Sequence, residues 1–261
     1  MFKAQLKDSK YWKSIFEAIN AIIVETNILI SPTEFKIMAM DSVHVTMLAL
    51  TLKKEDFEVY ECPEDADYSI GINLTDLLKI LKRAGSDDNI TFEYEPSDRH
   101  IYIKMNRPDS KKTKKFSLAL IDLDATKLPL QQLMDIPLPV IMNIDSKFIS
   151  EAISDAEIYT DAIRITANDT SIMFKSEGSI GEMEYVLEKE EFEISKFAEQ
   201  AEGTFTITKL KSILKIQTIA DKIEFGLGND TPARFIFNFF GASNIIYFLA
   251  PRVDQDTEEY S

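Results

Sequence analysis

"INLTDLLKILKRA", residues 72–84, and "TKLKSILKIQTIA", residues 208–220, are two segments of one pattern, 136 residues apart. Both contain Leu-Lys-Ile, at 78–80 and at 214–216, and both space their leucines and isoleucines at the three- and four-residue intervals of an amphipathic helix. A strand pair follows each segment: "NITFEY" and "HIYIKM" after the first, "KIEFGL" and "RFIFNF" after the second. This shared order predicts a helix–strand unit that occurs twice in the chain.

A second pair of matches supports the duplication. "DSK" occurs at 8–10 and at 145–147, each time after a short alternating strand, "FKAQL" or "VIMNI", and before apolar residues at helical spacing. "EFKIMAMD" and "TSIMFKSE" then match at nearly the same offset. Four matches in one order indicate an internal duplication. We therefore predict an α+β fold of two similar domains in which strands outnumber helices.

The two halves meet in residues 122–140, "DLDATKLPLQQLMDIPLPV", which contain three prolines. Proline interrupts regular elements, so we expect an extended connector, ordered because it retains apolar residues that can lie over a surface. An ordinary loop is the alternative. The predicted segments are an N-terminal domain at 1–123, a connector at 124–136, a C-terminal domain at 137–253 and an acidic tail at 254–261.

Composition limits the class of protein. The chain has 261 residues, 45% of them hydrophobic, a net charge of −15 and one cysteine, Cys62. A single cysteine excludes an intrachain disulfide and a paired-cysteine metal site, and it favours a reducing compartment. The first ten residues lack the pattern of a signal peptide, and no apolar stretch approaches the length of a membrane span. The acidic balance alone predicts a solvated protein and argues against a nucleic-acid partner.

The positive charges, however, are segregated on the predicted helices. Basic side chains lie opposite the apolar faces of three predicted helices, at 73–84, 208–220 and 10–23. The fourth helix, at 147–157, carries mainly acidic side chains. One charged helix face is ordinarily only solvated, but repetition at equivalent places of an acidic chain favours contacts with DNA phosphates, without base reading. The predicted DNA-binding residues are Lys10, Lys13, Lys79, Lys82, Arg83, Lys209, Lys211 and Lys215.

Two further segments carry opposite charge. "SKKTKKFSLAL" at 110–120 is basic and "EMEYVLEKEEFE" at 182–193 is acidic, and both include strand patterns. They are either solvated edge strands or the two halves of a head-to-tail contact, which closes into a ring if the rotation permits. The candidate interface residues are Lys112, Lys114, Lys115, Glu182 and Glu184.

Catalytic and metal-binding motifs are absent from the sequence. It contains no phosphate-binding G-x-x-x-x-G-K-[ST], no H-E-x-x-H and no G-x-S-x-G. Asp41, Ser42 and His44 lie close together, but in an extended strand Ser42 and His44 share a face that Asp41 opposes. We therefore predict a protein that is not an enzyme and uses no metal or cofactor.

Four segments carry a resemblance over essentially the whole chain: "MDSVHV" at 40–45, "GINLTDLLKILKRAG" at 71–85, "LIDLD" at 120–124 and "YFLAPRV" at 247–253. Together they resemble the sliding clamp family, in the group of proliferating cell nuclear antigens of archaea and eukaryotes. The resemblance implies a ring of three subunits with antiparallel sheets outside and helices around a channel for double-stranded DNA. It also implies that the protein binds a DNA polymerase, a clamp loader, a flap endonuclease and a DNA ligase. The compartment would be the cytoplasm of an archaeon or the nucleus of a eukaryote.

The resemblance also implies a docking pocket for short partner peptides with paired aromatic residues. Its residues would be Met40, His44, Val45, Leu128, Leu130, Pro232, Phe248, Ala250 and Pro251. His44 would then lie at the pocket rim, with a packed core histidine as the alternative. Phe248 lacks a hydroxyl that is common at this place, and the acidic helix at 147–157 lacks basic residues often found there. A subunit of a heterotrimeric clamp and an acidic scaffold that never encloses DNA are the competing functions; the self-complementary edges favour a homotrimer.

Overall fold

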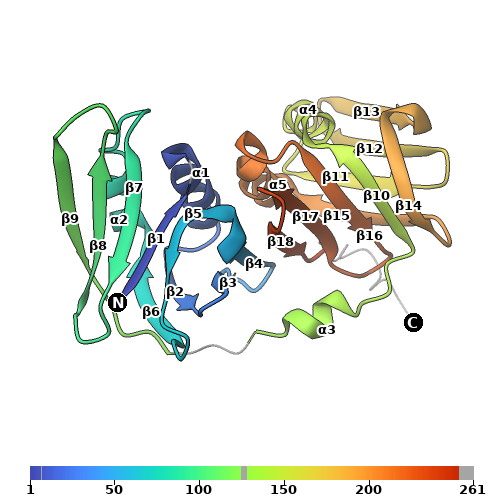
Figure 1. Ribbon diagram of the computed structural model, residues 1–261. Coiled ribbons are helices and arrows are strands. Elements are labelled where there is room, and N and C mark those ends of the chain that lie inside the picture. Colours follow the sequence, from blue (N-terminus) through green and yellow to red (C-terminus); the bar gives the residue numbers. More distant parts are fainter. Residues whose placement is uncertain (7, 125–127, 253–261) are drawn as a thin grey trace. The chain divides into compact units, whose positions relative to one another are not determined.

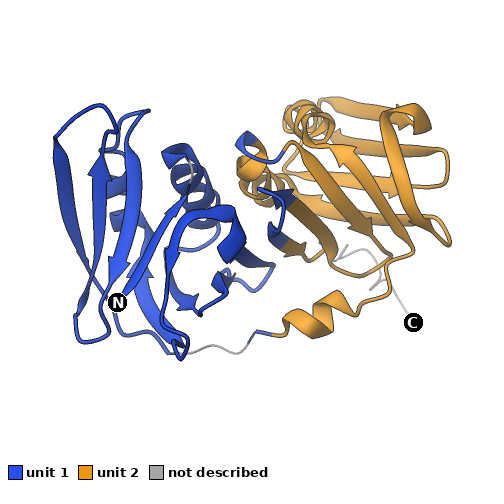
Figure 2. Ribbon diagram, in the orientation of Figure 1, with its two compact units in different colours: residues 1–128, 218–220, 238–246 blue, residues 129–217, 221–237, 247–261 orange. Residues whose placement is uncertain are grey.

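The computed structural model describes residues 1–6, 8–124 and 128–252, and its helices and strands are shown in Figure 1. The chain forms two compact units, coloured separately in Figure 2. Unit 1 comprises residues 1–128, 218–220 and 238–246, and unit 2 comprises residues 129–217, 221–237 and 247–261. Two segments of the second half, 218–220 and 238–246, therefore belong to the unit built by the first half.

The order of elements repeats, as the duplicated sequence predicts. The first run is β1 (Phe2–Leu6), α1 (Ser9–Asn20), β2 (Glu25–Ile30), β3 (Glu34–Met40), β4 (Thr46–Lys53), η1 (Lys54–Asp56), β5 (Phe57–Glu61), β6 (Tyr68–Asn73), α2 (Leu74–Leu81), β7 (Asn89–Tyr94), β8 (His100–Asn106) and β9 (Thr113–Ala119). The second is β10 (Val140–Asp145), α4 (Ser146–Ala156), β11 (Ala162–Ala167), β12 (Ser171–Gly178), β13 (Gly181–Glu188), η2 (Lys189–Glu191), β14 (Phe192–Phe197), β15 (Ala201–Thr206), α5 (Ile207–Ile213) with η3 (Leu214–Thr218), β16 (Lys222–Leu227), β17 (Ala233–Phe239) and β18 (Ser243–Leu249). The antiparallel strands and the few helices confirm the predicted α+β class.

The repeated "DSK" is a helix start in both copies. Asp8 and Asp145 have extended backbones, and each side chain accepts the backbone N–H of the lysine two residues on, at 2.8 Å for Lys10 and 2.9 Å for Lys147. An aspartate in this position caps the free N–H groups of a first helical turn. The match between the two halves thus has a local physical cause.

Strand order defines which edges stay open. Unit 1 contains a sheet of order β5-β1-β7-β8-β9 and a run of order β18-β4-β3-β2-β6, in which residues 243–246 of β18 belong to this unit. Unit 2 contains a sheet of order β13-β12-β11-β15 and a run of order β14-β10-β16-β17. β9 and β13 are therefore edge strands of their sheets.

Aromatic packing fills the core of unit 1. Trp12 of α1 is fully buried and packs its ring against Phe16, Phe35, Phe57 and Phe92, with ring centroids 4.5–6.0 Å apart. Its indole N–H donates to the carbonyl of Ile90 at 3.2 Å, which satisfies the one polar group of the side chain. The apolar face of α1 is thereby fixed against the sheet, and its opposite face stays available.

Two expectations need correction. The connector is not uniformly extended, because α3 (Leu130–Met134) forms inside it. Pro129 precedes this helix, in the N-cap position, where a missing N–H costs no helical hydrogen bond, and the other two prolines follow the helix end. The helix expected at 208–220 is an α-helix only to Ile213 and a 3₁₀-helix from Leu214 to Thr218.

No helix among the described residues is long and apolar enough to cross a bilayer. Within the same ranges, no cluster of three or more histidine, cysteine, aspartate or glutamate side chains has a metal-binding arrangement.

Candidate functional site

The basic side chains of unit 1 lie at the start of α1 and around the end of α2, and α1 and α2 contact each other. Lys13 is half-buried and donates its Nζ to the carbonyl of Ala84 at 2.8 Å, so it closes the C-terminal end of the neighbouring α2. Lys79 is 72% exposed and pairs with Asp76 at 2.8 Å. Lys10 lies 3.3 Å from Asp8. Lys79 and Lys10 are exposed and form ion pairs at the surface, whereas Lys13 is half-buried and bonds to the backbone.

Lys82 and Arg83 follow the last residue of α2 rather than lying inside it. The helix ends at Leu81, and both side chains are exposed on the turn beyond it. This turn is held from the sheet, because Lys114 donates its Nζ to the carbonyl of Arg83 at 3.0 Å. The row of basic side chains predicted on 73–84 therefore extends beyond α2 into a turn that Lys114 holds in place.

Unit 2 presents mixed charge around its helix pair, α4 and α5. Lys211 pairs with Glu157 at 2.6 Å, Lys209 is half-buried, and Lys215 is exposed on η3. Beside α4 runs a shallow groove of about 650 Å³. Its charged and aromatic lining residues are Asp145, Lys147, Glu151, Asp155, Tyr185 and Asp221. The helices of unit 2 thus carry a more mixed charge than those of unit 1.

Tyr185 connects the edge strand β13 to the acidic side of α4. Its hydroxyl donates to Glu151 at 3.1 Å. Burial, together with this hydrogen bond to a carboxylate, raises the pKa of Tyr185 to about 12. The phenol therefore stays neutral and keeps its donor role over the physiological pH range.

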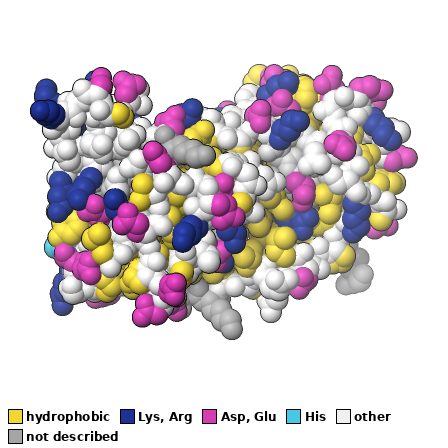
Figure 3. Space-filling model, viewed as in Figure 1, with side chains coloured by type: hydrophobic (Ala, Val, Ile, Leu, Met, Phe, Trp, Pro, Cys, Tyr) yellow, Lys and Arg dark blue, Asp and Glu magenta, His cyan; other side chains and the backbone are white. Residues whose placement is uncertain are grey.

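The edge strands β9 and β13 alternate between exposed and covered side chains. On β9, Phe116 is half-buried and Leu118 is buried; on β13, Met183 and Tyr185 are half-buried and Leu187 is buried. Both strands thus carry apolar side chains on one face, next to unpaired backbone groups. In Figure 3, lysines and arginines gather along the side of unit 1 that β9 borders, whereas positive and negative groups are interspersed elsewhere on this face.

Four of the five charged residues predicted for these edges have partners within their own units. Lys114 lies 3.5 Å from Asp88, and Lys115 lies over the ring of Tyr102 at 4.0 Å from its centroid. Lys112 is exposed just before β9. On the other edge, Lys175 lies 3.0 Å from Glu182 and 3.9 Å from Glu184. The edge charges are therefore partly compensated inside the chain.

Asp88 anchors the loop next to β9. Its carboxylate accepts the backbone N–H of Gly85 at 2.9 Å. This hydrogen bond, together with the nearby Lys114 and Arg107, holds the pKa of Asp88 below its usual range. The loop after α2 and the first residues of β9 are thus tied together by one carboxylate.

His44 lies in a turn between β3 and β4, not in a strand. Its side chain is exposed and its backbone φ of 57° is in the left-handed region. The alternative of a packed core histidine is therefore wrong. Asp41 is 3% exposed, and its Oδ1 accepts the backbone N–H of Val45 at 2.8 Å and of Thr46 at 3.0 Å. Oδ1 of Asp41 therefore holds the backbone of the turn that presents His44.

The structural role of Asp41 was missed by the sequence reasoning, which weighed it only as a triad member. Aspartate at the end of a strand pattern is a common turn former, because its side chain accepts nearby backbone N–H groups. The segment "MDS" directly after an alternating apolar strand is the signal that could have found it.

The other docking residues are placed as follows. In unit 1, Met40 ends β3 and is half-buried, as are Val45 and Leu128. In unit 2, Leu130 begins α3 and is half-buried, and Pro232, Ala250 and Pro251 are half-buried around the ends of β17 and β18. Phe248 is only 3% exposed, so it can support a surface from beneath. Residues 125–127 of the connector and 254–261 of the predicted tail lie outside the described residues.

Comparisons with known proteins cover both halves. The family model described as "Proliferating cell nuclear antigen, N-terminal domain" matches residues 1–127, and the one described as "Proliferating cell nuclear antigen, C-terminal domain" matches residues 133–252. Proteins named "DNA polymerase sliding clamp" are similar over nearly their whole length. That of Methanococcus vannielii is 29% identical over 97% of this chain and 100% of its own, and that of Methanobrevibacter smithii is 27% identical over 98% and 100%.

A solved structure agrees with the fold. The Proliferating Cellular Nuclear Antigen from Entamoeba histolytica superimposes with a TM-score of 0.86 at 23% sequence identity, over 97% of this chain and 99% of that one.

Proposed function

Because this chain belongs to the proliferating cell nuclear antigen family, we propose that it is a DNA sliding clamp: a ring of three copies that encloses double-stranded DNA and docks replication and repair proteins. The observation that carries the proposal is the match of both family domains, in order, to the two halves of a duplicated chain. Such a protein has no active site of its own and acts by keeping a polymerase on its template.

Ring closure through β9 and β13 is supported by the duplication. β18 is the repeat of β9, β13 is the repeat of β4, and within unit 1 the first half of β18 lies beside β4. If the same pairing is used between copies, β9 of one copy lies beside β13 of the next. That is a head-to-tail contact, which closes into a ring when the rotation permits.

Backbone and apolar contacts would provide most of the stability of the contact between β9 and β13, because Lys114 and Lys175 already have carboxylate partners inside the chain. An unpaired strand edge is a ready template for another strand. The charged residues Lys112, Lys114, Lys115, Glu182 and Glu184 would then set the register and exclude wrong pairings, which is the usual contribution of rim charges.

Light scattering during size-exclusion chromatography tests the ring. Three copies of a 29.8 kDa chain give a mass of about 90 kDa. Reversing Glu182 and Glu184 to lysine is expected to weaken the trimer, and adding Lys112→Glu and Lys114→Glu to the same chain is expected to restore part of it. Glu193→Lys, an exposed change on β14, is the matched control. A wild-type monomer at every concentration would exclude the homotrimer and leave the heterotrimeric clamp.

DNA would contact the helices through phosphates. The predicted residues are Lys10, Lys13, Lys79, Lys82, Arg83, Lys209, Lys211 and Lys215; all of them except Lys13 and Lys209 are exposed. Removing one lysine that binds a phosphate should reduce the slope of log affinity against log salt by roughly 0.9. Lys79→Ala, Lys82→Ala and Lys215→Ala together should therefore lower both affinity and slope. A matched control replaces three exposed lysines outside the α-helices, Lys54, Lys189 and Lys196.

The topological claim has a direct test. Clamp assembled on a nicked circular plasmid by a clamp loader should stay with the DNA through gel filtration in high salt, and it should be lost after one restriction cut that lets the ring slide off. Equal retention on linear and circular DNA would refute enclosure. A trimer that is never retained would favour the acidic scaffold.

Partner docking would use a surface formed by Met40, His44, Val45, Leu128, Leu130, Pro232, Phe248, Ala250 and Pro251. The partners expected are a polymerase, a clamp loader, a flap endonuclease and a ligase, each with a short peptide that inserts aromatic residues. A few buried anchors carry most of the energy of such contacts. Leu128→Asp places an unpaired charge against those anchors and should abolish peptide capture in calorimetric titration, while the trimer stays intact. Equal affinities would refute the pocket.

A further inference from the structure

A small cavity in unit 1 has a lining that none of the clamp functions uses. It holds about 180 Å³ and is lined by Leu6, Asp8, Tyr11, Asp56 and Phe240. These residues come from the end of β1, the start of α1, η1 and the turn between β17 and β18, all of them within unit 1. We call it the Asp56 cavity.

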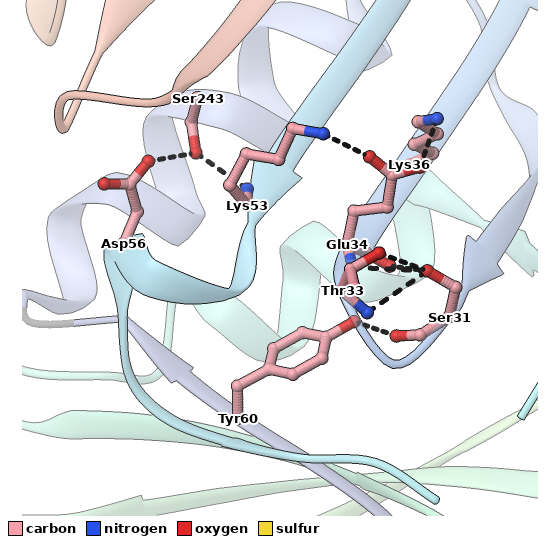
Figure 4. Close-up of polar contacts among 8 residues, drawn as sticks. All are labelled: Ser31, Thr33, Glu34, Lys36, Lys53, Asp56, Tyr60 and Ser243. Atoms are coloured by element: carbon pink, nitrogen blue, oxygen red, sulfur yellow. Dashed lines mark hydrogen bonds and ion pairs between the residues drawn. The ribbon is translucent and has the colours of Figure 1, made fainter. Parts of the chain in front are cut away.

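The residue Asp56 is largely buried, and its hydrogen bonds among the described residues use only one of its two carboxylate oxygens. It is 8% exposed, and its Oδ2 accepts the hydroxyl of Ser243 at 2.6 Å and the backbone N–H of Ala242 at 3.1 Å. Figure 4 shows the carboxylate meeting Ser243 through one oxygen, while the other points away. Among the described residues, Oδ1 accepts no hydrogen bond and no lysine or arginine pairs with Asp56.

A carboxylate in a partly enclosed cavity attracts a cation, because water screens its charge less there than at an open surface. Asp8, at the rim, already shares its charge with Lys10, whose Nζ lies 3.3 Å from the carboxylate and 5.1 Å from the centroid of the Tyr11 ring. The cavity therefore keeps one uncompensated negative charge, at Asp56.

The opposite walls are aromatic. The rings of Tyr11 and Phe240 meet edge to face with centroids 4.3 Å apart. Aromatic faces attract cations, and they do so most strongly where water is excluded. An aromatic pair beside a carboxylate is the lining that suits an ammonium group.

Phe240 adopts a backbone conformation that its side chain does not favour. Its φ is 62°, and Gly241 after it has a φ of 120°. A tight turn with positive φ at both central residues ordinarily takes asparagine and glycine there, and a bulky residue in this region is an outlier. Such strain is kept where the surroundings hold it, often at binding sites. Here it places the ring against Tyr11.

We propose that the Asp56 cavity binds the primary ammonium group of a lysine side chain from a partner protein. The volume favours a side chain, because pockets for whole ligands usually hold roughly 300–1,000 Å³. The net charge of −15 would attract a basic partner to this chain. The ammonium would donate to Asp56 Oδ1 and lie against the two rings. This site is independent of ring closure and of the docking pocket.

The test follows the Leu6 methyl signals of the full chain by NMR during titration with Nα-acetyl-lysine N-methylamide. We expect saturable shifts with the lysine derivative and none with its Nε-acetylated form, which has no charge. Asp56→Asn should weaken binding at least tenfold, given the usual strength of hydrogen bonds to charged groups of about 1.5–3 kcal/mol. Asp67→Asn, an exposed change in the same unit, is the control.

Phe240→Asn separates binding from folding. Asparagine suits the positive φ, so the turn should be as stable as in wild type or more so, while loss of the aromatic wall should weaken binding about two- to fivefold. Unchanged affinity in both Asp56→Asn and Phe240→Asn, or equal binding of the neutral derivative, would overturn the proposal. Tighter binding of putrescine than of the lysine derivative would overturn the assignment to a protein side chain.

Discussion

Replacing Asp41 tests how the turn that presents His44 and Val45 is built. The carboxylate is 3% exposed, and its Oδ1 accepts two backbone N–H groups, from Val45 at 2.8 Å and from Thr46 at 3.0 Å. The backbone N–H of His44 also donates to the carbonyl of Asp41, at 3.0 Å. Asp41→Ala removes the side-chain acceptor and keeps the backbone bond, so it isolates the contribution of the carboxylate.

The expected cost is about 3 kcal/mol. A hydrogen bond to a charged group contributes roughly 1.5–3 kcal/mol, and two bonds that share one oxygen are less than additive. Thr46 is buried, so its N–H would be left without a partner where water does not reach easily. Asp41→Asn keeps an uncharged acceptor and should cost about half as much.

Amide hydrogen exchange in the full chain measures this cost at the site, because opening of the turn exposes the two N–H groups. In Asp41→Ala, exchange at Val45 and Thr46 should accelerate about a hundredfold, which corresponds to about 3 kcal/mol. Ser42→Ala changes an exposed neighbour in the same turn and should leave both amides protected.

Less than about threefold acceleration in Asp41→Ala would refute this account of the turn. A partner peptide tests the consequence for docking. Asp41→Ala should weaken binding of the peptide, because it loosens the turn that holds His44 and Val45. His44→Gly suits the φ of 57° and removes only the side chain, so it reports on the imidazole without strain.

Three further predictions concern the edge strands and their supports. Asp88→Asn should lower the urea midpoint more at pH 7 than at pH 3. The folded-state pKa of Asp88 is depressed, so its stabilisation is fully present above the ordinary pKa of about 4 and decreases as the pH falls toward the lower folded value; an equal difference at both pH values would contradict this. In urea denaturation, Gly178→Ala should destabilise the β12–β13 hairpin by about 1–3 kcal/mol, because its Cβ would clash with the carbonyl oxygen of Tyr159, and it should also weaken self-association. Gly85→Ala should be mild in the same experiment, because its Cβ would meet the flexible end of Arg107 at 3.2 Å and the carboxylate of Asp88 at an ordinary 3.6 Å. Glu151→Gln should bring the pKa of Tyr185 down from about 12 in an ultraviolet titration, since it removes a carboxylate that disfavours the phenolate; no change would leave burial, with Asp155 and Glu191, as the cause.

The sequence by itself determined the features that arise within one or two turns of chain. Each "DSK" stands between a predicted strand and a predicted helix, and both helices do start there, because each aspartate caps the N–H groups that follow it directly. The apolar spacing at 10–23 and 147–157 predicted which face each helix buries, and Trp12, Phe16, Ile149 and Ile153 are buried accordingly. Local capping and periodicity depend on neighbouring residues, so a short stretch of sequence is enough to predict them.

Helix ends and the connector were predicted less well. The pattern at 208–220 has the right spacing, but the α-helix stops at Ile213 and tightens into a 3₁₀-helix. The prolines of the connector were expected to prevent regular structure, yet α3 fits between Pro129 and Pro137. Periodicity places a helix but does not say how long its hydrogen-bond pattern lasts, because tertiary packing competes with it at each end.

Only the tertiary structure decided which charges are free and which are already paired. Lys13 was predicted to face DNA, but it holds the carbonyl of Ala84, 71 residues away. Asp56 showed no pattern of its own, and its partner Ser243 lies 187 residues along the chain. The return of residues 238–246 to unit 1 creates both that contact and the Asp56 cavity. Contacts between residues so far apart depend on how whole strands pair, which no local stretch of sequence specifies.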